Sequence, residues 1–396
     1  MKQRKIREDV FLLGAVDWDR RLFDALIPLP DGTSYNAYLI RGREKTALVD
    51  SVDPSQTGVL MRQLEEVDRV DYVISHHAEQ DHSGAIPAVL TRYPDARVIA
   101  TPQAKGMLTD LLPIGQDKFV TVADGETLTL GGKTLEFVHT PWVHWPETMC
   151  TYLREDRILF SCDFFGSHLA TTDLYARDEA RVAEAAKRYY AEIMMPFRKV
   201  IQRNLDKIEG RPLDLIAPSH GPIYDRPTWI IEAYRDWVAD AVRNAAVVAY
   251  VSMHGSTEAM VRYLVDSLVE RGVEVHQFSL PVTDLGRLAI ALVDAATLVL
   301  GAPTVLAGPH PHAFLAAALA NALRPKLRYA SLVGSYGWST RAAEQVVGML
   351  PNLKVEILSP VLCQGYPRDR DFLALAGLAE AILQKHRSIG LGEGSI

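Results

Sequence analysis

Apolar residues along the first 240 positions fall in short runs typical of β-strands, separated by turn-forming residues such as Pro30-Asp31-Gly32. The pattern predicts strands at residues 10–13, 35–40, 46–49, 72–74, 97–100, 127–130, 134–138, 149–153 and 158–160. Helical spacing occurs at about 57–67 and 86–92 and then in a long region from 178 to 208. Strands followed by helices on their outer faces favour an αββα sandwich.

The pattern changes to regular alternation of strand and helix after a helix predicted at residues 226–244. The predicted strands are 246–251, 273–278, 298–301, 329–333 and 355–359, and the predicted helices are 258–271, 285–295, 313–323, 341–350 and 371–386. Five such units predict a doubly wound, five-stranded parallel sheet. We therefore expect an α/β protein with two domains, residues 1–244 and 245–396.

The composition is that of a globular enzyme, with 48% apolar residues, 23% charged residues and a formal net charge of -7. A net negative charge does not favour binding to nucleic acid or to an anionic membrane. No apolar run approaches the roughly 20 residues that span a bilayer. Three widely spaced cysteines, Cys150, Cys162 and Cys363, predict no disulfide framework and favour the cytoplasm. The sequence contains no Cys-x-x-Cys, so we expect neither a rubredoxin-type centre nor an iron–sulfur cluster.

Candidate chemistry gathers in Ser75-His76-His77-Ala78-Glu79-Gln80-Asp81-His82-Ser83-Gly84, directly after an apolar run at residues 70–74. Alternate side chains of an extended segment share a face, so we expect His77, Glu79 and Asp81 to converge. His82 then leads into a helical pattern, which places the cluster on a strand-to-helix loop. Nitrogen and oxygen donors on such a loop indicate a divalent metal site rather than a solvated polar loop.

Three further donors, His144, Asp163 and His220, follow apolar runs downstream. Each alone is a weak signal, but the seven donors together are enough for two metals that share a bridging ligand. Two divalent ions carry four positive charges, of which Glu79, Asp81 and Asp163 neutralise three and a bridging hydroxide the fourth. A neutral buried centre is the easier one to desolvate. Imidazole and carboxylate suit iron, manganese and zinc alike, so the donors do not choose the metal.

The pattern His77-x-Glu79-x-Asp81-His82, with His144-Trp145-Pro146, Asp163 and His220-Gly221, resembles the flavodiiron (A-type flavoprotein) family. It is the His-x-His-x-Asp-His signature of the metallo-β-lactamase superfamily with Glu79 in place of the second histidine. The resemblance implies a metallo-β-lactamase-like sandwich in which one iron takes His77, Glu79 and His144. The other iron takes Asp81, His82 and His220, and Asp163 bridges the two. We interpret His76 and His139 as structural and expect His168 to lie in the shell around the ligands.

A second candidate site begins where the strand at 246–251 runs into Ser252-Met253-His254-Gly255-Ser256-Thr257 and a helix follows. Hydroxyls, a glycine and free amides at a helix N-terminus form a phosphate cradle, and the absence of Gly-x-Gly-x-x-Gly favours a mononucleotide. Two more loops follow the third and fourth strands, at the sheet edge where ligands bind: Pro303-Thr304-Val305-Leu306-Ala307-Gly308 and Ser335-Tyr336-Gly337-Trp338. This half resembles flavodoxin, which implies FMN. Tyr336 and Trp338 either pack near the isoalloxazine ring or simply cover the sheet.

The family resemblance implies an oxidoreductase in which electrons from an external donor reach FMN and then a non-haem diiron centre that reduces O2 to water or NO to N2O. Two ferrous ions and a two-electron flavin hold four electrons, the number that O2 requires, so we favour O2. One alternative is a dinuclear zinc hydrolase with a fused flavodoxin electron-transfer module, against which Glu79, Trp145 and Phe164 argue. Another is an electron-transfer flavoprotein with a vestigial metal domain.

The resemblance also implies rubredoxin or a reduced deazaflavin as the electron donor, and a head-to-tail homodimer or a dimer of dimers. It extends over nearly the whole chain and includes no appended rubredoxin or reductase module. Two segments depart from the family pattern: Phe23-Asp24-Ala25-Leu26, where many members have Phe-His-Gly-Tyr, and Leu306-Ala307, where an Asn-Asn pair is common. We expect Tyr189 or Tyr190 to line the gas pocket.

Overall fold

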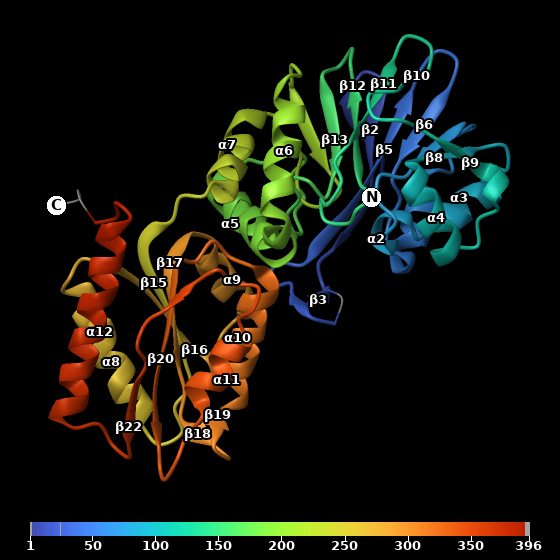
Figure 1. Ribbon diagram of the computed structural model, residues 1–396. Helices are drawn as coiled ribbons and strands as arrows, with labels where there is room; N and C mark the ends of the chain where they lie inside the picture. Colours follow the sequence, from blue (N-terminus) through green and yellow to red (C-terminus); the bar gives the residue numbers. More distant parts are fainter. Residues whose placement is uncertain (1, 24, 393–396) are drawn as a thin grey trace. The chain divides into compact units, whose positions relative to one another are not determined.

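The computed structural model describes residues 2–23 and 25–392, so Asp24 lies outside the described residues. The chain divides into two compact units (Figure 1). The first unit runs to Tyr190 and includes Phe197–Val238, and the second consists of Ala191–Pro196 and the chain from Ala239 onward.

Two sheets form the centre of the first unit. The larger has the order β1 (Arg4–Arg7), β2 (Val10–Asp17), β5 (Thr33–Arg41), β6 (Thr46–Val49), β7 (Tyr72–Ile74), β8 (Arg97–Ala100) and β9 (Phe119–Thr121). The smaller has the order β10 (Thr127–Thr129), β11 (Thr134–His139), β12 (Met149–Leu153), β13 (Ile158–Cys162) and β14 (Leu215–Pro218). A short hairpin, β3 (Leu22–Phe23) and β4 (Ile27–Pro28), stands apart from both sheets.

Apolar side chains on both faces of the larger sheet explain why β5 is buried along almost its whole length. Tyr38 and Ile40 belong to the core between the two sheets, whereas Tyr35, Ala37 and Leu39 belong to a second core on the other face. That second core includes residues of α1 (Thr57–Gln63), α3 (Ile86–Arg92) and α4 (Pro102–Leu111). The helices α5 (Glu179–Tyr189), α6 (Arg198–Glu209) and α7 (Pro227–Val238) stand beside the smaller sheet (Figure 1). The unit is thus the expected αββα sandwich.

The second unit is a parallel sheet in the order β16 (Glu274–Ser279), β15 (Arg243–Tyr250), β17 (Ala295–Gly301) and β20 (Tyr329–Tyr336), with β21 (Glu356–Ile357) and β22 (Val361–Gln364) both paired with β20. Its long helices are α8 (Ser256–Val269), α9 (Leu285–Asp294), α10 (Pro311–Leu323), α11 (Ala342–Gly348) and α12 (Asp369–Ser388). The strand order 2-1-3-4-5 is that of flavodoxin-like sheets, with the fifth strand in two pieces.

Several element boundaries differ from the prediction. The helix predicted at 226–244 ends at Val238, because β15 begins at Arg243 and pairs with two neighbouring strands. The helical region 178–208 is interrupted by the π-helical turn η3 (Tyr190–Met194) and the 3-10 turn η4 (Met195–Phe197), where Pro196 cannot donate a helical hydrogen bond. The fifth strand is divided around Pro360 for the same reason. The missed helix α4 has a sequence signal, since the Thr101 hydroxyl accepts from the Ala104 amide and caps it.

Candidate metal centre and flavin cleft

The seven predicted metal donors lie on the loops that follow β7, β11, β13 and β14, and the structure brings all of them together. The short helix α2 (Gln80–Ser83) begins directly after Glu79. The prediction that His77, Glu79 and Asp81 share one face is therefore wrong for Asp81. The helical turn carries Asp81 away from Glu79 and places it with His82 and His220.

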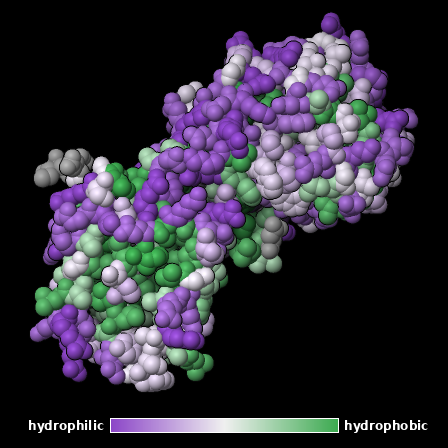
Figure 2. Space-filling model, viewed as in Figure 1, coloured by the Kyte–Doolittle hydropathy of each residue, from purple (hydrophilic) through white to green (hydrophobic). Residues whose placement is uncertain are grey.

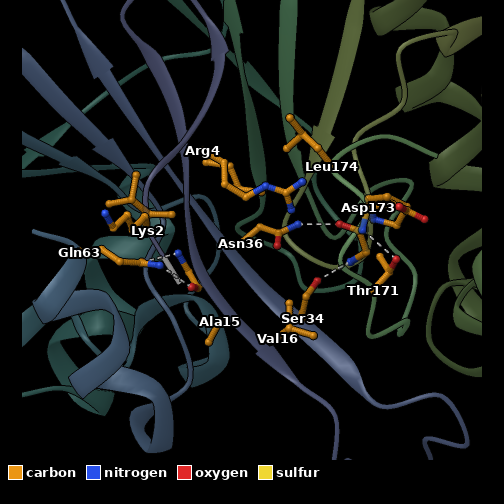
Figure 3. Close-up of a pocket in the computed structure, with 15 residues that line it drawn as sticks. Lys2, Arg4, Ala15, Val16, Ser34, Asn36, Gln63, Thr171, Asp173 and Leu174 are labelled. Carbon is orange, nitrogen blue, oxygen red and sulfur yellow. Dashed lines mark hydrogen bonds between the residues drawn. The ribbon is translucent and has the colours of Figure 1, made fainter. Parts of the chain in front are cut away.

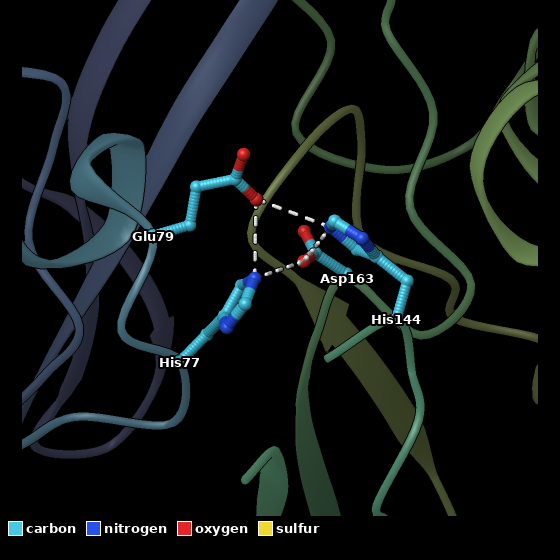
Figure 4. A group of neighbouring side chains, drawn as sticks. All are labelled: His77, Glu79, His144 and Asp163. Atoms are coloured by element: carbon cyan, nitrogen blue, oxygen red, sulfur yellow. Dashed lines mark hydrogen bonds and ion pairs between the residues drawn. The ribbon is translucent and has the colours of Figure 1, made fainter. Parts of the chain in front are cut away.

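We define position A as the point surrounded by His77, Glu79, His144 and Asp163, whose donor atoms all lie within 4.8 Å of one another (Figure 4). Glu79 Oε2 is 3.1 Å from both His77 Nε2 and His144 Nε2. Asp163 Oδ2 is 3.6 Å from the same two nitrogen atoms. Two imidazoles and two carboxylates therefore face one point.

We define position B as the point surrounded by Asp81, His82, His220 and Asp163. His220 Nε2 is 3.1 Å from Asp81 Oδ2, and His82 Nε2 is 3.4 Å from Asp81 Oδ1. Asp163 Oδ1 is 3.0 Å from His82 Nε2 and 3.4 Å from His220 Nε2. Asp163 thus directs one carboxylate oxygen to each position, which is the geometry of a bridging ligand.

These side chains fit a pair of divalent cations because several of their polar atoms are buried and face one another without forming a hydrogen bond. Asp81 Oδ1 and Oδ2, His82 Nε2 and Asp163 Oδ2 make no hydrogen bond to any residue that the structure describes. Leaving each such atom unpaired costs about 1–3 kcal/mol, and metal coordination removes that cost. The side chains at position B are at most 3% exposed, while Glu79 and His144 at position A are each 14% exposed.

The electrostatics of the cluster also favour cations. Burial lowers the pKa of His77, but hydrogen bonds to Glu147 and Glu79 outweigh it and raise the pKa to about 9. Burial likewise opposes a charge on His220, yet Asp163 and Asp81 raise its pKa to about 10. Burial would raise the pKa of the Asp163 carboxyl, but the surrounding imidazoles hold it well below its usual range. The negative field that favours protonated imidazoles equally favours divalent metals.

Each of three ligand imidazoles has a partner for its outer nitrogen, which fixes the ring so that Nε2 faces the metal position. His77 Nδ1 donates to Glu147 Oε1 at 2.7 Å. His220 Nδ1 donates to the Ser34 carbonyl at 2.7 Å, and His82 Nδ1 lies 3.6 Å from the thiol sulfur of Cys162. Sequence reasoning missed the role of Glu147, although a carboxylate three residues after a ligand histidine was a usable signal.

Backbone strain is concentrated around the same loops. Asp50, Trp142, Cys162 and Phe165 all have φ between 54° and 67°, a region that side chains other than glycine seldom adopt. Each precedes or supports a ligand loop, and Cys162 directly precedes Asp163. Strain of about 1–3 kcal/mol per residue persists where surrounding contacts fix the backbone, as at functional sites.

The other predicted histidines lie outside positions A and B. His76 bonds Asp50 Oδ2 and Thr151 Oγ1, both at 2.7 Å, which fits the structural role. His139 is half-buried at the end of β11. His168 Nδ1 is 2.9 Å from Thr33 Oγ1, and its ring lies 4.9 Å from the His220 ring, between Phe23 and Tyr189. His168 therefore lies in the shell around position B.

The Tyr189 hydroxyl donates to Asp163 Oδ1 at 2.7 Å.

The predicted flavin loops surround one open cleft of about 470 Å³ at the carboxyl ends of the strands of the second unit. Its lining consists of Ser252, Met253, His254, Ser256, Thr257, Pro303, Thr304, Val305, Leu306, Ser335, Tyr336, Gly337, Trp338 and Gly365. Of the predicted residues, Gly255, Ala307 and Gly308 do not line it, and Gly365 was missed. Gly255 has φ of 84° and precedes α8, so its backbone turns the loop into the helix that points its amides at the cleft.

Two other hollows have different characters. In the first unit, Lys2, Arg4, Asn36 and Gln63 are among the residues around a space of about 30 Å³, roughly one water molecule (Figure 3). In the second unit, β17, β20 and α11 line an apolar pocket of about 300 Å³, and apolar side chains gather on the visible face of this unit (Figure 2). Neither hollow contains the predicted ligands or flavin loops.

Comparison with known proteins places this geometry in a family. Residues 33–221 match the model described as ODP family beta lactamase, and residues 248–374 match the flavodoxin model. The chain is 35% identical to a nitric oxide reductase of Moorella thermoacetica over 92% of its length and 94% of that protein. It is 37% identical to a coenzyme F420H(2) oxidase of Methanothermobacter marburgensis over 78% of its length and 79% of that protein. Rubredoxin oxygen:oxidoreductase from Desulfovibrio gigas matches with a TM-score of 0.94 and 27% identity, over 98% of this chain and 99% of that one.

The fold and the site define a two-domain flavoprotein with a metallo-β-lactamase-like domain. The chain belongs to the flavodiiron (type A flavoprotein) family and is an oxidoreductase. Proteins of this family carry FMN and a pair of non-haem irons, and this chain has a fitting site for each. The zinc hydrolase alternative is not favoured by these relationships. Among the described residues, no helix is long and apolar enough to cross a membrane.

Proposed function

We propose that this protein reduces O2 to water, with NO as an alternative substrate, at an iron pair held in positions A and B. Residues 1–244 hold the irons through His77, Glu79, Asp81, His82, His144, Asp163 and His220, and residues 245–396 hold FMN. The observation that supports this most directly is Asp163, which directs one oxygen to each of two positions. Each position also has two imidazoles and one further carboxylate, so the donor sets suit two ions of the same metal.

When bound, FMN supplies electrons and the iron pair binds and reduces the small gas. The protein residues hold both groups and keep the site dry. Trp145 packs edge-on against the ring of His77 at 4.9 Å, and Phe23 covers His168 at 5.1 Å. Burial raises the pKa of Tyr189 well above its usual value, which keeps a proton on the hydroxyl that faces Asp163.

The choice of gas follows from the electron count. Two ferrous ions and a two-electron flavin hold the four electrons that convert O2 to two waters without release of peroxide. The related proteins include both a nitric oxide reductase and a rubredoxin oxygen:oxidoreductase, so we consider both gases as substrates. The F420H(2) oxidase and rubredoxin names suggest a reduced deazaflavin or rubredoxin as electron donor. Three buried, unpaired cysteines support a reducing compartment such as the cytoplasm.

The test is a stoichiometric reaction of the iron- and FMN-loaded chain. The protein is reduced anaerobically, freed of excess reductant and mixed with O2 or NO in separate electrode experiments. We expect two irons and one FMN per chain, about one O2 consumed per chain and no peroxide. Two zinc ions with turnover of ester substrates, or a loaded protein that consumes neither gas, would refute the proposal.

We further propose a head-to-tail homodimer in which FMN of one subunit serves the iron pair of its partner. Exposed apolar side chains flank both sites, with Trp18, Leu22 and Leu26 near the hairpin that covers His168, and Leu306 and Trp338 at the flavin cleft. The test mixes subunits that carry Asp163→Asn with subunits that carry Ser256→Asp at the phosphate loop. A head-to-tail pair restores one complete site and therefore part of the activity. Electron transfer within one chain gives none.

A further inference from the structure

Positions A and B have equal sets of direct donors but unequal surroundings. Each set has two imidazole nitrogens, one carboxylate of its own and one oxygen of Asp163. The formal charge of these donors is therefore the same at both positions. A difference between two irons bound there would therefore come from their surroundings, namely the groups that contact the donors from outside and the access of solvent.

A buried carboxylate contacts the donors of position A. Glu147 Oε1 accepts from His77 Nδ1 at 2.7 Å and from the Ala78 amide at 3.0 Å. The side chain of Glu147 is fully buried, so water does not screen its charge. Its backbone carbonyl accepts from the Thr101 hydroxyl at 3.0 Å, which fixes the loop that carries it. A carboxylate hydrogen-bonded to a ligand imidazole makes that imidazole a stronger electron donor.

Among the described residues, no carboxylate accepts a hydrogen bond from the outer nitrogen of either imidazole at position B. His220 Nδ1 donates to the backbone carbonyl of Ser34, and His82 Nδ1 faces the Cys162 sulfur at 3.6 Å. Asp50 is the other buried carboxylate nearby, but its oxygens bond His76 and Ser219 rather than a ligand imidazole.

The bridging carboxylate is polarised in the same direction. Asp163 Oδ1, which faces position B, accepts a hydrogen bond from the Tyr189 hydroxyl at 2.7 Å. Asp163 Oδ2, which faces position A, has no hydrogen bond from any described residue. A donated hydrogen bond draws negative charge toward the oxygen that receives it and reduces what that oxygen can give a metal. The oxygen at position A keeps its full donor strength.

We propose that Glu147 is a positioning residue that acts through His77 to make position A the electron-richer half of the pair, so that a metal held at A would have a lower reduction potential than the same metal held at B. The Tyr189–Asp163 hydrogen bond adds to the same asymmetry. This inference rests on the proposed iron pair. It deepens that proposal by assigning the ferric ion of the half-oxidised centre to His77, Glu79 and His144.

The test compares iron-loaded wild type with Glu147→Gln, which keeps a hydrogen-bond acceptor for His77 but removes the charge. Redox titration followed by electron paramagnetic resonance gives the two one-electron potentials of the pair. We expect Glu147→Gln to keep two irons and FMN. Loss of the charge should disfavour the first ferric ion about tenfold, which corresponds to a rise of about 59 mV in the potential of the first one-electron step. Glu136→Gln, which makes the same chemical change at a carboxylate of β11 that pairs with Arg154 and Arg211 rather than with a ligand imidazole, is the matched control and should leave this potential unchanged.

A variant that keeps both irons with unchanged potentials overturns the inference, because a purely structural glutamate would behave in that way. If wild type itself binds no iron pair or consumes neither gas, the proposed function fails instead, so the two failures are distinguishable.

A second measurement does not depend on the folding of the Glu147 variant. In half-oxidised protein, electron–nuclear double resonance detects the imidazole nitrogens bound to the ferric ion. His144→Gln should remove one of these signals and His220→Gln should not; the reverse result overturns the inference.

Discussion

The Tyr189 hydroxyl donates a 2.7 Å hydrogen bond to Asp163 Oδ1, the carboxylate oxygen that faces position B. Both side chains are buried, and they come from α5 and from the loop that joins β13 to α5, 26 positions apart. The bond connects the shared donor of the two metal positions to a proton-bearing group. It also places one of the two tyrosines expected at the gas pocket directly against the centre.

Replacing Tyr189 by Phe should leave the metals bound but slow gas reduction by about 10- to 100-fold, because the bridging carboxylate loses its partner. Loss of the bond should also lower the free energy of unfolding by about 1–3 kcal/mol. Metal analysis, gas electrodes and urea unfolding measure these effects. Tyr190→Phe is the matched control, since the Tyr190 hydroxyl donates to the Trp237 carbonyl away from Asp163. Equal losses in both variants would contradict a specific role for Tyr189.

Replacing Asp163 by Asn should abolish gas reduction, with a loss of at least about 100-fold, while FMN stays bound. An amide cannot give a charged oxygen to both positions, so at least one iron should be lost. Iron analysis and the flavin absorption spectrum check both parts of the expectation. Full activity in this variant would instead support the electron-transfer flavoprotein with a vestigial metal domain.

Acid should destabilise the second unit through His386, whose side chain is buried between Asn244 and Thr297 at 2.7 Å from each. Burial lowers the pKa of His386 from 6.5 to about 4 in the folded protein. Between about pH 4 and pH 6.5, His386 of the unfolded chain therefore binds a proton that His386 of the folded chain does not bind. Stability is unaffected above pH 6.5 and falls as the pH drops toward 4.

The expected contribution of His386 to this loss is at most about 3 kcal/mol. His386→Gln has no side chain that can be protonated in this range. It should therefore reduce the pH dependence of the free energy of unfolding between pH 6.5 and about 4. Urea unfolding followed by release of FMN fluorescence measures it. An unchanged slope in His386→Gln would contradict the assignment.

The tip of the β18 (Thr304–Val305) and β19 (Gly308–Pro309) hairpin should become more stable when Leu306-Ala307 is replaced by Asn-Gly. Leu306 and Ala307 have φ of 52° and 65°, and Leu306 is 95% exposed. A two-residue hairpin loop in which both residues have positive φ favours Asn and Gly. The double variant should therefore raise the free energy of unfolding by about 1 kcal/mol. Urea unfolding measures the gain. Leu315→Asn, at a half-exposed position of α10, should give no gain, because it removes apolar surface without relieving strain.

The sequence by itself indicated the two α/β halves, most of their strands and helices, and the seven candidate ligands that the structure gathers around positions A and B. These features are local. Hydrophobic periodicity encodes a strand or helix within a few residues, and a donor-rich loop directly after an apolar run is visible without knowledge of its partners. The phosphate loop from Ser252 to Thr257 was readable for the same reason.

Alternation along the chain grouped Asp81 with His77 and Glu79, whereas the tertiary structure places it with His82 and His220, as the family resemblance implies. Asp81 leaves the face of His77 because a helical turn starts at Gln80, and that turn is fixed by packing rather than by alternation. The contacts of Glu147 with His77 and of Tyr189 with Asp163 join residues 70 and 26 positions apart. No periodicity within one element encodes such a pair, because the distance between its members depends on how separate strands and helices pack. The inequality of the two metal positions is therefore a property of the fold.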